Sequence, residues 1–160
     1  MSKIVLGFRK IHPDAKIPTY AHEGDAGMDV CAIEDVELNP LRPTLVKTGL
    51  VAEIPDGYEI QVRPRSGMAL KQGITVWNAP GTIDCKYRGE IGVILMWVPI
   101  LEATDGDGMH LAYNGCPHEI AKGDRIAQLV LAPVTQAECV EVQSVSETDR
   151  GTGGFGSTGK

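Results

Sequence analysis

Two arginines and a serine stand close together in RPRSGMAL, residues 63–70, and their types suit the binding of a phosphate group. Arginine offers charged donors in a planar fork, and serine adds a neutral donor. We expect Ser66 to cap a short helix over residues 67–71, which Gly73 would end. The free N–H groups of such a helix would strengthen a phosphate site beside Arg65. The alternative is an ordinary corner between a strand and a helix, with solvated arginines.

A second segment, WNAPGTIDCKYRGEIGVIL at residues 77–95, combines an amide, a carboxylate and an aromatic ring. We expect a hairpin in which NAPGTID forms the turn and YRGEIGVIL forms the returning strand. Asp84 would lie at the end of the turn. Beside a phosphate, Asp84 could orient and deprotonate an attacking water. Tyr87 could stack on a sugar or base, and Asn78 could read a base edge. Asp and Tyr are also common in hairpins for structural reasons alone.

Three shorter stretches carry further polar side chains. In HEGDAGMDV, Asp29 opens a predicted strand and could hold a water bound to Mg²⁺, a cation that prefers oxygen ligands. In KGDRIAQLVLAPV, Gln128 alternates with apolar residues, so its amide faces something other than the core. The last eleven residues, RGTGGFGSTGK, include five glycines together with Arg150, Phe155 and a Ser-Thr pair. The glycine content is typical of a loose tail. It does not explain why the tail also contains an arginine, a phenylalanine and a Ser-Thr pair.

Short apolar runs, each closed by turn residues, predict the elements that must position these side chains. Valine and isoleucine dominate the runs, and no window keeps a helical period over three turns. We therefore predict an all-β fold, a jelly-roll-like sandwich or barrel, with one short helix after Ser66. Residues 1–146 would form this domain, with a long hairpin or loop at residues 99–119. Residues 147–160 would form a flexible Gly-rich C-terminal arm.

Composition and charge limit the function. The 160 residues have a net charge of −6, from 15 basic and 21 acidic residues, which argues against a general nucleic-acid binder. The four cysteines form no C-x-x-C pair, which favours reduced thiols. The N-terminus lacks a signal-peptide core, and no apolar run approaches the ~20 residues of a membrane span. We expect a cytoplasmic protein with no membrane or nucleic-acid partner.

Taken in order, five of these stretches resemble the five sequence motifs of the homotrimeric dUTP diphosphatase (dUTPase) family. The matching segments are AGMDV, PRSGMAL, GTIDCKYRGE with the preceding Asn78, GDRIAQL and RGTGGFGSTG. Each motif alone is a weak signal, but five in the same order make chance an implausible explanation. The resemblance implies a dUTPase-like β-clip fold and a homotrimer in which three subunits share each active site.

The resemblance also implies the reaction, which is hydrolysis of dUTP to dUMP and pyrophosphate with Mg²⁺. Such a reaction limits uracil in DNA and supplies dUMP for thymidylate synthesis. Asp84 takes the position of the residue that activates water for in-line attack on the α-phosphorus. Tyr87 would stack under the deoxyribose, where a 2′-OH would clash, and Asn78 would read uracil's edge. Asp29 would act through water on a Mg²⁺ that the substrate phosphates mainly hold.

The C-terminal arm is implied to close over the bound nucleotide, with Arg150 at the γ-phosphate and Phe155 over the uracil ring. Its glycines would let the backbone approach the triphosphate, and closure would exclude water. The full implied set of substrate-binding residues is Arg65, Ser66, Gly67, Asn78, Gly81, Ile83, Tyr87, Gln128, Arg150, Phe155, Gly156, Ser157 and Thr158.

Two departures from the family pattern stand out. Met28 stands where the family often has tyrosine, and residues 99–119 are longer than the usual connection, so they could serve a partner protein or a subunit contact.

Two alternative functions stay open. A dCTP deaminase has a similar fold but needs a glutamate placed for deamination, and YRGE with the complete arm favours the phosphohydrolase. A nucleotide-sensing module without important turnover is the other alternative, and the intact Asp84 argues against it.

Overall fold

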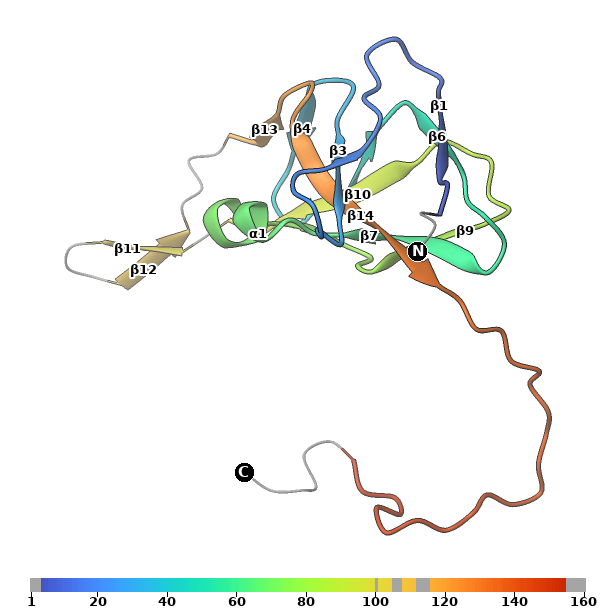
Figure 1. Ribbon diagram of the computed structural model, residues 1–160. Helices are drawn as coiled ribbons and strands as arrows, with labels where there is room; N and C mark the ends of the chain where they lie inside the picture. The colour runs from blue at the N-terminus through green and yellow to red at the C-terminus, as the bar shows by residue number, and fades with distance from the viewer. Residues whose placement is uncertain (1–3, 100, 105–107, 112–115, 155–160) are drawn as a thin grey trace.

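The computed structural model describes residues 4–99, 101–104, 108–111 and 116–154 (Figure 1). Within these residues, small antiparallel sheets and one short helix surround a single apolar core. The predicted all-β fold with one helix is confirmed. No helix in the described part of the chain is long and apolar enough to cross a membrane.

The largest sheet has five antiparallel strands in the order β2-β3-β14-β7-β9. These strands are β2 (Thr19–Tyr20), β3 (Met28–Cys31), β14 (Arg125–Pro133), β7 (Tyr58–Arg63) and β9 (Gly81–Asp84). One face of the sheet packs on the core because apolar side chains alternate along the strands, as Ile60 and Val62 do in β7. The other face carries polar side chains, including Gln61 between them.

A β-bulge near the start of β14 decides which polar side chains share that outer face. Arg125 pairs with Cys31, but Ala127 already pairs with Val30, so the register shifts by one residue between them. In a regular strand, residues three apart point to opposite faces. The extra residue of the bulge brings Arg125 onto the same face as Gln128, which lies opposite Asp29.

Three smaller sheets close the core from the other sides. Their strands are β5 (Thr44–Lys47), β10 (Gly92–Trp97) and β8 (Ile74–Val76) in one sheet, β1 (Gly7–Lys10) and β6 (Leu50–Glu53) in the second, and β4 (Val36–Leu38) and β13 (His118–Ile120) in the third. Fully buried side chains from all these sheets meet in the core, among them Leu38, Leu50, Ile74, Leu95, Ile120 and Leu129. Burying each contributes about 1.5–3 kcal/mol.

Helix α1 (Ser66–Gln72) follows β7 and packs on the core through Met68, which is buried. Gly73 ends it as predicted, since its φ of 68° lies in the left-handed region and its N–H donates to the Met68 carbonyl oxygen. The predicted cap is wrong by one residue. Arg65 occupies the N-cap position with extended backbone, and Ser66 already belongs to the first helical turn.

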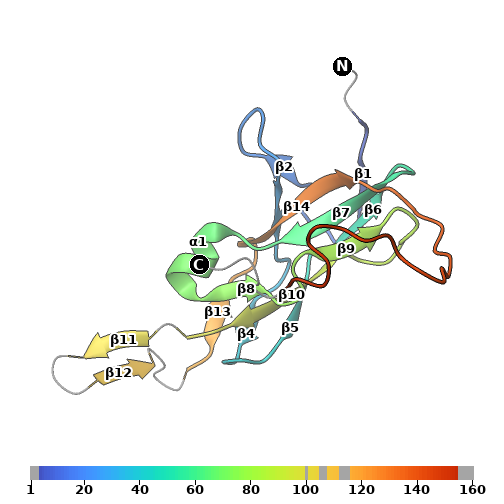
Figure 2. The ribbon, with the colours of Figure 1, turned by 90° about the horizontal axis from the view of Figure 1, so that it is seen from below.

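Within residues 99–119, where the sequence predicts a hairpin or a loop, the structure has a hairpin. Strands β11 (Leu101–Thr104) and β12 (Gly108–Leu111) pair antiparallel. Figures 1 and 2 both show this hairpin projecting beyond α1, away from the other sheets. Binding of a partner protein there stays a prediction.

After β14 the chain leaves the body of the protein. Residues 134–146 contain no helix or strand, and the side chains of Val140 and Val145 are exposed by 68% and 83%. Figure 1 shows the segment running away from the sheets in a wide loop. The division into a domain of residues 1–146 and a flexible arm of residues 147–160 stays a prediction.

Candidate functional site

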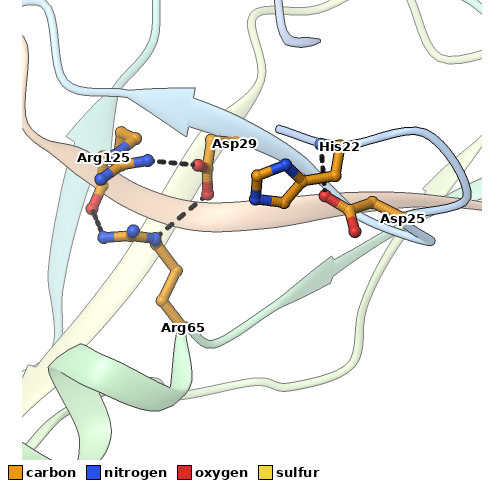
Figure 3. Close-up of polar contacts among 5 residues, drawn as sticks. All are labelled: His22, Asp25, Asp29, Arg65 and Arg125. Atoms are coloured by element: carbon orange, nitrogen blue, oxygen red, sulfur yellow. Dashed lines mark hydrogen bonds and ion pairs between the residues drawn. The ribbon is translucent and has the colours of Figure 1, made fainter. Parts of the chain in front are cut away.

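Asp29 on β3 lies between two arginines from distant parts of the chain (Figure 3). Arg65 Nε donates to Asp29 Oδ1 at 3.1 Å, and Arg125 Nη1 donates to Asp29 Oδ2 at 3.0 Å. Arg65 Nη1 also donates to the carbonyl oxygen of Arg125 at 3.0 Å. These contacts join the start of α1 to the start of β14. We call Asp29, Arg65 and Arg125 the arginine cluster.

The arginine cluster can bind an anion because it has two positive charges and one negative charge. A guanidinium has five N–H donors, and the contacts described use only some of them. The Asp29 side chain is 16% exposed and that of Arg125 is 57% exposed, so the carboxylate is the inner anchor and Arg125 faces solvent. Guanidinium groups match phosphate oxygens in geometry and charge. The cluster is therefore a candidate phosphate site.

Cys31 lies on the same face of the sheet as the arginine cluster but adds no charge to it. Burial raises the pKa of the Cys31 thiol, although the positive charges of Lys16, Arg125 and Arg65 act in the opposite direction. The thiol therefore stays protonated at neutral pH, and the positive balance of the cluster is unchanged.

Gln128 on β14 is partly buried and extends the cluster along the same face. It lies opposite Asp29 on one side and opposite Arg63 on the other. A Cβ atom at Gly27 would lie 3.2 Å from Gln128 Cβ and Cδ, so glycine leaves room for this side chain against the loop before β3. Arg63 instead donates to Gln61 Oε1 through Nε, at 3.0 Å, and belongs to a separate chain of contacts along β7.

The open side of the arginine cluster borders the first turn of α1 and the loop before β3. Ser66 and Gly67 are exposed there, and a Cβ atom on Gly67 would meet no heavy atom within 4 Å. In the loop, the His22 N–H donates to Asp25 Oδ2 at 2.8 Å and closes a turn beside the cluster (Figure 3). The structure thus places Arg65, Ser66 and Gly67 beside one another.

The segment at residues 77–95 differs from the predicted hairpin. GTID forms strand β9 and pairs with β7, not with the returning chain, whereas β10 pairs with β8 and β5. The prediction of a single turn over NAPGTID is therefore wrong. The reason is that β7 offers β9 a full antiparallel partner from a distant part of the sequence, which a local pattern does not reveal. A turn at residues 85–91 then leads to β10.

Asp84 and Tyr87 line one small recess at the end of β9. The recess has a volume of about 170 Å³ and is bordered also by Thr82, Ile83, Glu90, Ile91 and Gly92. The Tyr87 N–H donates to the Asp84 carbonyl oxygen at 3.0 Å, which closes the turn between them. The Asp84 side chain is exposed, and Tyr87 is 48% exposed. A carboxylate and a ring are therefore accessible side by side.

The other residues predicted in this segment contribute in different ways. Ile83 is 9% exposed and belongs to the core, and Gly81 is buried opposite Val62. Either could contact a ligand only through its backbone. Asn78 is exposed, and its Nδ2 would lie 3.1 Å from a Cβ atom placed on Gly81, so glycine lets the amide lie close to β9.

The arginine cluster and the Asp84 recess lie at opposite ends of β7. Asp84 pairs with Glu59 at the start of β7, whereas Arg65 follows the end of that strand. Glu59 and Arg65 are six residues apart, a separation of about 20 Å in extended chain. One chain therefore does not bring Asp84 and Arg65 to the same phosphate.

The described part of the C-terminal arm makes contacts within itself. Arg150 Nε donates to the Gly153 carbonyl oxygen at 2.9 Å, and the Gly151 N–H donates to the Thr148 carbonyl oxygen at 2.9 Å. The predicted contact of Arg150 with a γ-phosphate is therefore not prearranged within the chain. The other arm residues of the prediction, which lie outside the described residues, are Phe155, Gly156, Ser157 and Thr158.

Sequence reasoning missed Arg125, although the segment that contains it was singled out. Arg125 comes three residues before Gln128, a spacing that a regular strand would divide between two faces. The bulge in β14 removes that difference, and no residue in GDRIAQL signals a bulge.

Known proteins match the chain over almost its whole length. The dUTPase family model matches residues 13–99 and 106–159. The deoxyuridine 5'-triphosphate nucleotidohydrolase of Picosynechococcus sp. is 53% identical over 154 residues, which are 96% of this chain and 98% of that protein.

Solved structures agree with the sequence matches. The Staphylococcus bacteriophage 80alpha dUTPase with dUpNHpp has a TM-score of 0.83 and 30% identity, over 99% of this chain and 100% of that chain. A mutant dUTPase from phage phi11 of S. aureus, solved to show the coordination of a structural Mg(II) ion, has a TM-score of 0.74 and 27% identity, over 90% of this chain and 100% of that one.

The two ion pairs of Asp29 should differ in strength although their distances are nearly equal. Arg65 is 24% exposed and Arg125 is 57% exposed, so solvent screens the second pair more. In double-mutant cycles with Asp29→Asn, we expect a coupling energy of about 1–2 kcal/mol with Arg65→Gln and below about 0.5 kcal/mol with Arg125→Gln. Urea unfolding at fixed protein and salt concentrations measures both. Equal coupling energies would contradict the assignment of Asp29–Arg65 as the inner pair.

Proposed function

The chain belongs to the dUTPase family, and we propose from this premise that it cleaves dUTP to dUMP and pyrophosphate with the two groups of residues described above. The observation that supports the proposal is the presence, at the matching motifs, of a pair of arginines held by Asp29 and of an accessible carboxylate beside a tyrosine ring. Neither group alone could supply both charge neutralisation and a base.

In the proposed reaction, Asp84 accepts a proton from a water molecule as the water oxygen attacks the α-phosphorus. The bond from this phosphorus to the bridging oxygen breaks, and pyrophosphate leaves. Arg65 and Arg125 neutralise the charge that the phosphate oxygens carry, with Gln128 as a neutral donor beside them. Asp29 holds both arginines at fixed positions, so little rearrangement is needed when the substrate binds.

Each site would combine residues from more than one subunit of a homotrimer. The separation of about 20 Å between Asp84 and Arg65 in extended chain favours this arrangement, because both must reach one triphosphate. The recess of one subunit would then face the arginine cluster of a neighbour. Since the reaction needs both groups, the isolated chain would be nearly inactive.

The residues present fit a Mg²⁺ that arrives with the substrate. Among the described residues, no group of three or more His, Cys, Asp or Glu side chains could hold a metal ion. A carboxylate has about four acceptor positions, and the arginines use two of those on Asp29, so Asp29 can still accept hydrogen bonds from metal-bound water. When bound, Mg²⁺ would supply further charge neutralisation at the triphosphate.

Selectivity would come from the recess and the residues around Asn78. Tyr87 would stack under the deoxyribose and leave no room for a 2′-OH. The Asn78 amide and the backbone of Gly81 and Ile83 would bind uracil's edge, and a thymine methyl group would not fit. A cytoplasmic location completes the proposal.

The C-terminal arm would complete the site by closing over the nucleotide. Among the described residues, the Arg150 side chain contacts only Gly153 of its own arm, so it is available to exchange that contact for the γ-phosphate. Phe155, Gly156, Ser157 and Thr158 would follow, with the ring over uracil and the hydroxyl groups at phosphate oxygens.

Pyrophosphate release from a panel of nucleotides tests the function. We expect release from dUTP with Mg²⁺, far less from UTP, dCTP and dTTP, and a strong decrease when Mg²⁺ is chelated. Ammonia production from dCTP would overturn the proposal in favour of a deaminase. Tight binding of dUTP without any turnover would favour a sensor.

Mixing two inactive variants tests the shared site. Asp84→Asn removes the base and Arg65→Gln removes a phosphate ligand, and we expect each to lower turnover on the order of a hundredfold or more. In randomly mixed trimers, roughly a quarter of the sites would receive an intact Asp84 and an intact Arg65 from different subunits. Activity should therefore rise toward that fraction after co-refolding. A mixture of Asp84→Asn with Asp84→Ala is the control, and no rise in the first mixture would rule out sharing.

Truncation after Asp149 tests the arm. Because residues 150–154, the described part of this segment, lie outside the sheets and the core, we expect the free energy of unfolding to stay unchanged. Hydrolysis should fall on the order of a hundredfold, since the closed site loses Arg150 and its shield from water. Denaturant unfolding and pyrophosphate release measure the two effects. Full activity in the truncated protein would show that closure is not required.

A further inference from the structure

The turn at residues 85–91 is held by contacts that the proposed reaction does not use. Tyr87 Oη donates to the Glu90 carbonyl oxygen at 3.1 Å, so the ring bends back over its own turn. Arg88 Nη1 donates to the carbonyl oxygens of Cys85 at 2.7 Å and Tyr87 at 2.9 Å. The position of the Tyr87 ring is therefore set within the turn itself.

Gly89 makes room for that ring. A Cβ atom on Gly89 would overlap Tyr87 Oη and Tyr87 Cζ, closer than any real contact. The atoms in the way belong to the far end of a side chain and not to the backbone. A methyl group at this position would thus move the ring and leave the fold in place.

Glu90 ties the turn to the rigid core. Its Oε1 accepts a hydrogen bond from the Gly49 N–H at 2.8 Å. Gly49 has a φ of 65°, and a Cβ atom there would lie 2.7 Å from His12 Cβ and 2.9 Å from Ala15 Cβ, so this turn cannot shift easily. A hydrogen bond from a backbone N–H to a carboxylate is charge-assisted and stronger than a neutral one.

Two contacts from the neighbouring residues reinforce the same junction. Thr48, which is fully buried, donates through Oγ1 to the Ile91 carbonyl oxygen at 2.6 Å. The Ile91 N–H donates to the Leu50 carbonyl oxygen at 2.8 Å. The hydrogen bonds therefore form one path from the turn at Gly49 through Glu90 to the hydroxyl group of Tyr87.

We propose that Gly89 and Glu90 are positioning residues that fix the Tyr87 ring and so determine the preference for deoxyribose over ribose. The inference rests on the proposed function, in which Tyr87 stacks under the sugar. A single hydroxyl distinguishes the two sugars, so the exclusion of ribose depends on where the ring edge lies. Gly89 determines how far the ring bends back, and Glu90 holds the carbonyl oxygen that binds its hydroxyl.

The test compares the kcat/KM values for dUTP and UTP in variants of the full chain. Gly89→Ala displaces the ring, and Glu90→Ala releases the turn from Gly49. We expect each to lower the dUTP-to-UTP ratio roughly tenfold, through a higher KM for dUTP and a higher kcat/KM for UTP. Glu90→Gln keeps an acceptor oxygen for the Gly49 N–H and should retain most of the ratio. Glu37→Ala, at an exposed site on β4, is the matched control and should leave the ratio unchanged.

The outcomes separate this inference from the proposed function. If the unmodified protein releases no pyrophosphate from dUTP, the proposed function fails and this inference fails with it. If it prefers dUTP but folded Gly89→Ala and Glu90→Ala keep the full ratio, only the inference is overturned. If Glu90→Gln loses as much selectivity as Glu90→Ala, the hydrogen bond to Gly49 is not the cause. Should the alanine variants not fold, Tyr87→Phe removes the hydroxyl anchor alone, and an unchanged ratio there overturns the proposal.

Discussion

The antiparallel register of β14 between β3 and β7 is the constraint on which both the core and the site depend. In this register Leu129 points into the core while Gln128, its neighbour, lies on the outer face opposite Asp29. A slip of one residue would exchange the two faces, burying polar groups and exposing apolar ones. The hydrophobic core therefore selects the same register that assembles the candidate phosphate site. Stability and function are linked through one strand.

The bulge in β14 modifies that constraint at one end only. It leaves the pairing with β7 regular from Gln128 to Pro133, so the core below is undisturbed. At the other end it turns Arg125 toward Asp29, and the hydrogen bond from Arg65 to the Arg125 carbonyl oxygen secures the junction. A local irregularity thus adds a second cation to the site without a cost in core packing.

Local patterns in the sequence predicted most of the elements but not their pairing. The alternation of apolar residues predicted the strands, and Gly73 predicted the end of α1, because both signals depend on neighbours in sequence. The exchange of partners by β9, which joins β7 instead of β10, depends on contacts between residues 19 to 25 positions apart and leaves no local sign. The same limit applies to Arg125. The five motifs predicted the site residues, but only the fold shows that Asp84 and Arg65 lie at opposite ends of one strand.

Charge presents a last apparent conflict, since a chain of net charge −6 is proposed to bind a triphosphate. The conflict is resolved by distance. At about 0.1 M salt, charges more than ~10 Å apart are largely screened, so the acidic surface contributes little at the phosphates. The arginine cluster acts at hydrogen-bond distance and is partly buried, where screening is weaker. The carboxylate of Asp29 also holds both arginines in place before the substrate arrives. Their positive charges therefore need little rearrangement to bind an anion. A protein can therefore be acidic overall and still select a polyanion, provided that its few cations are held in place.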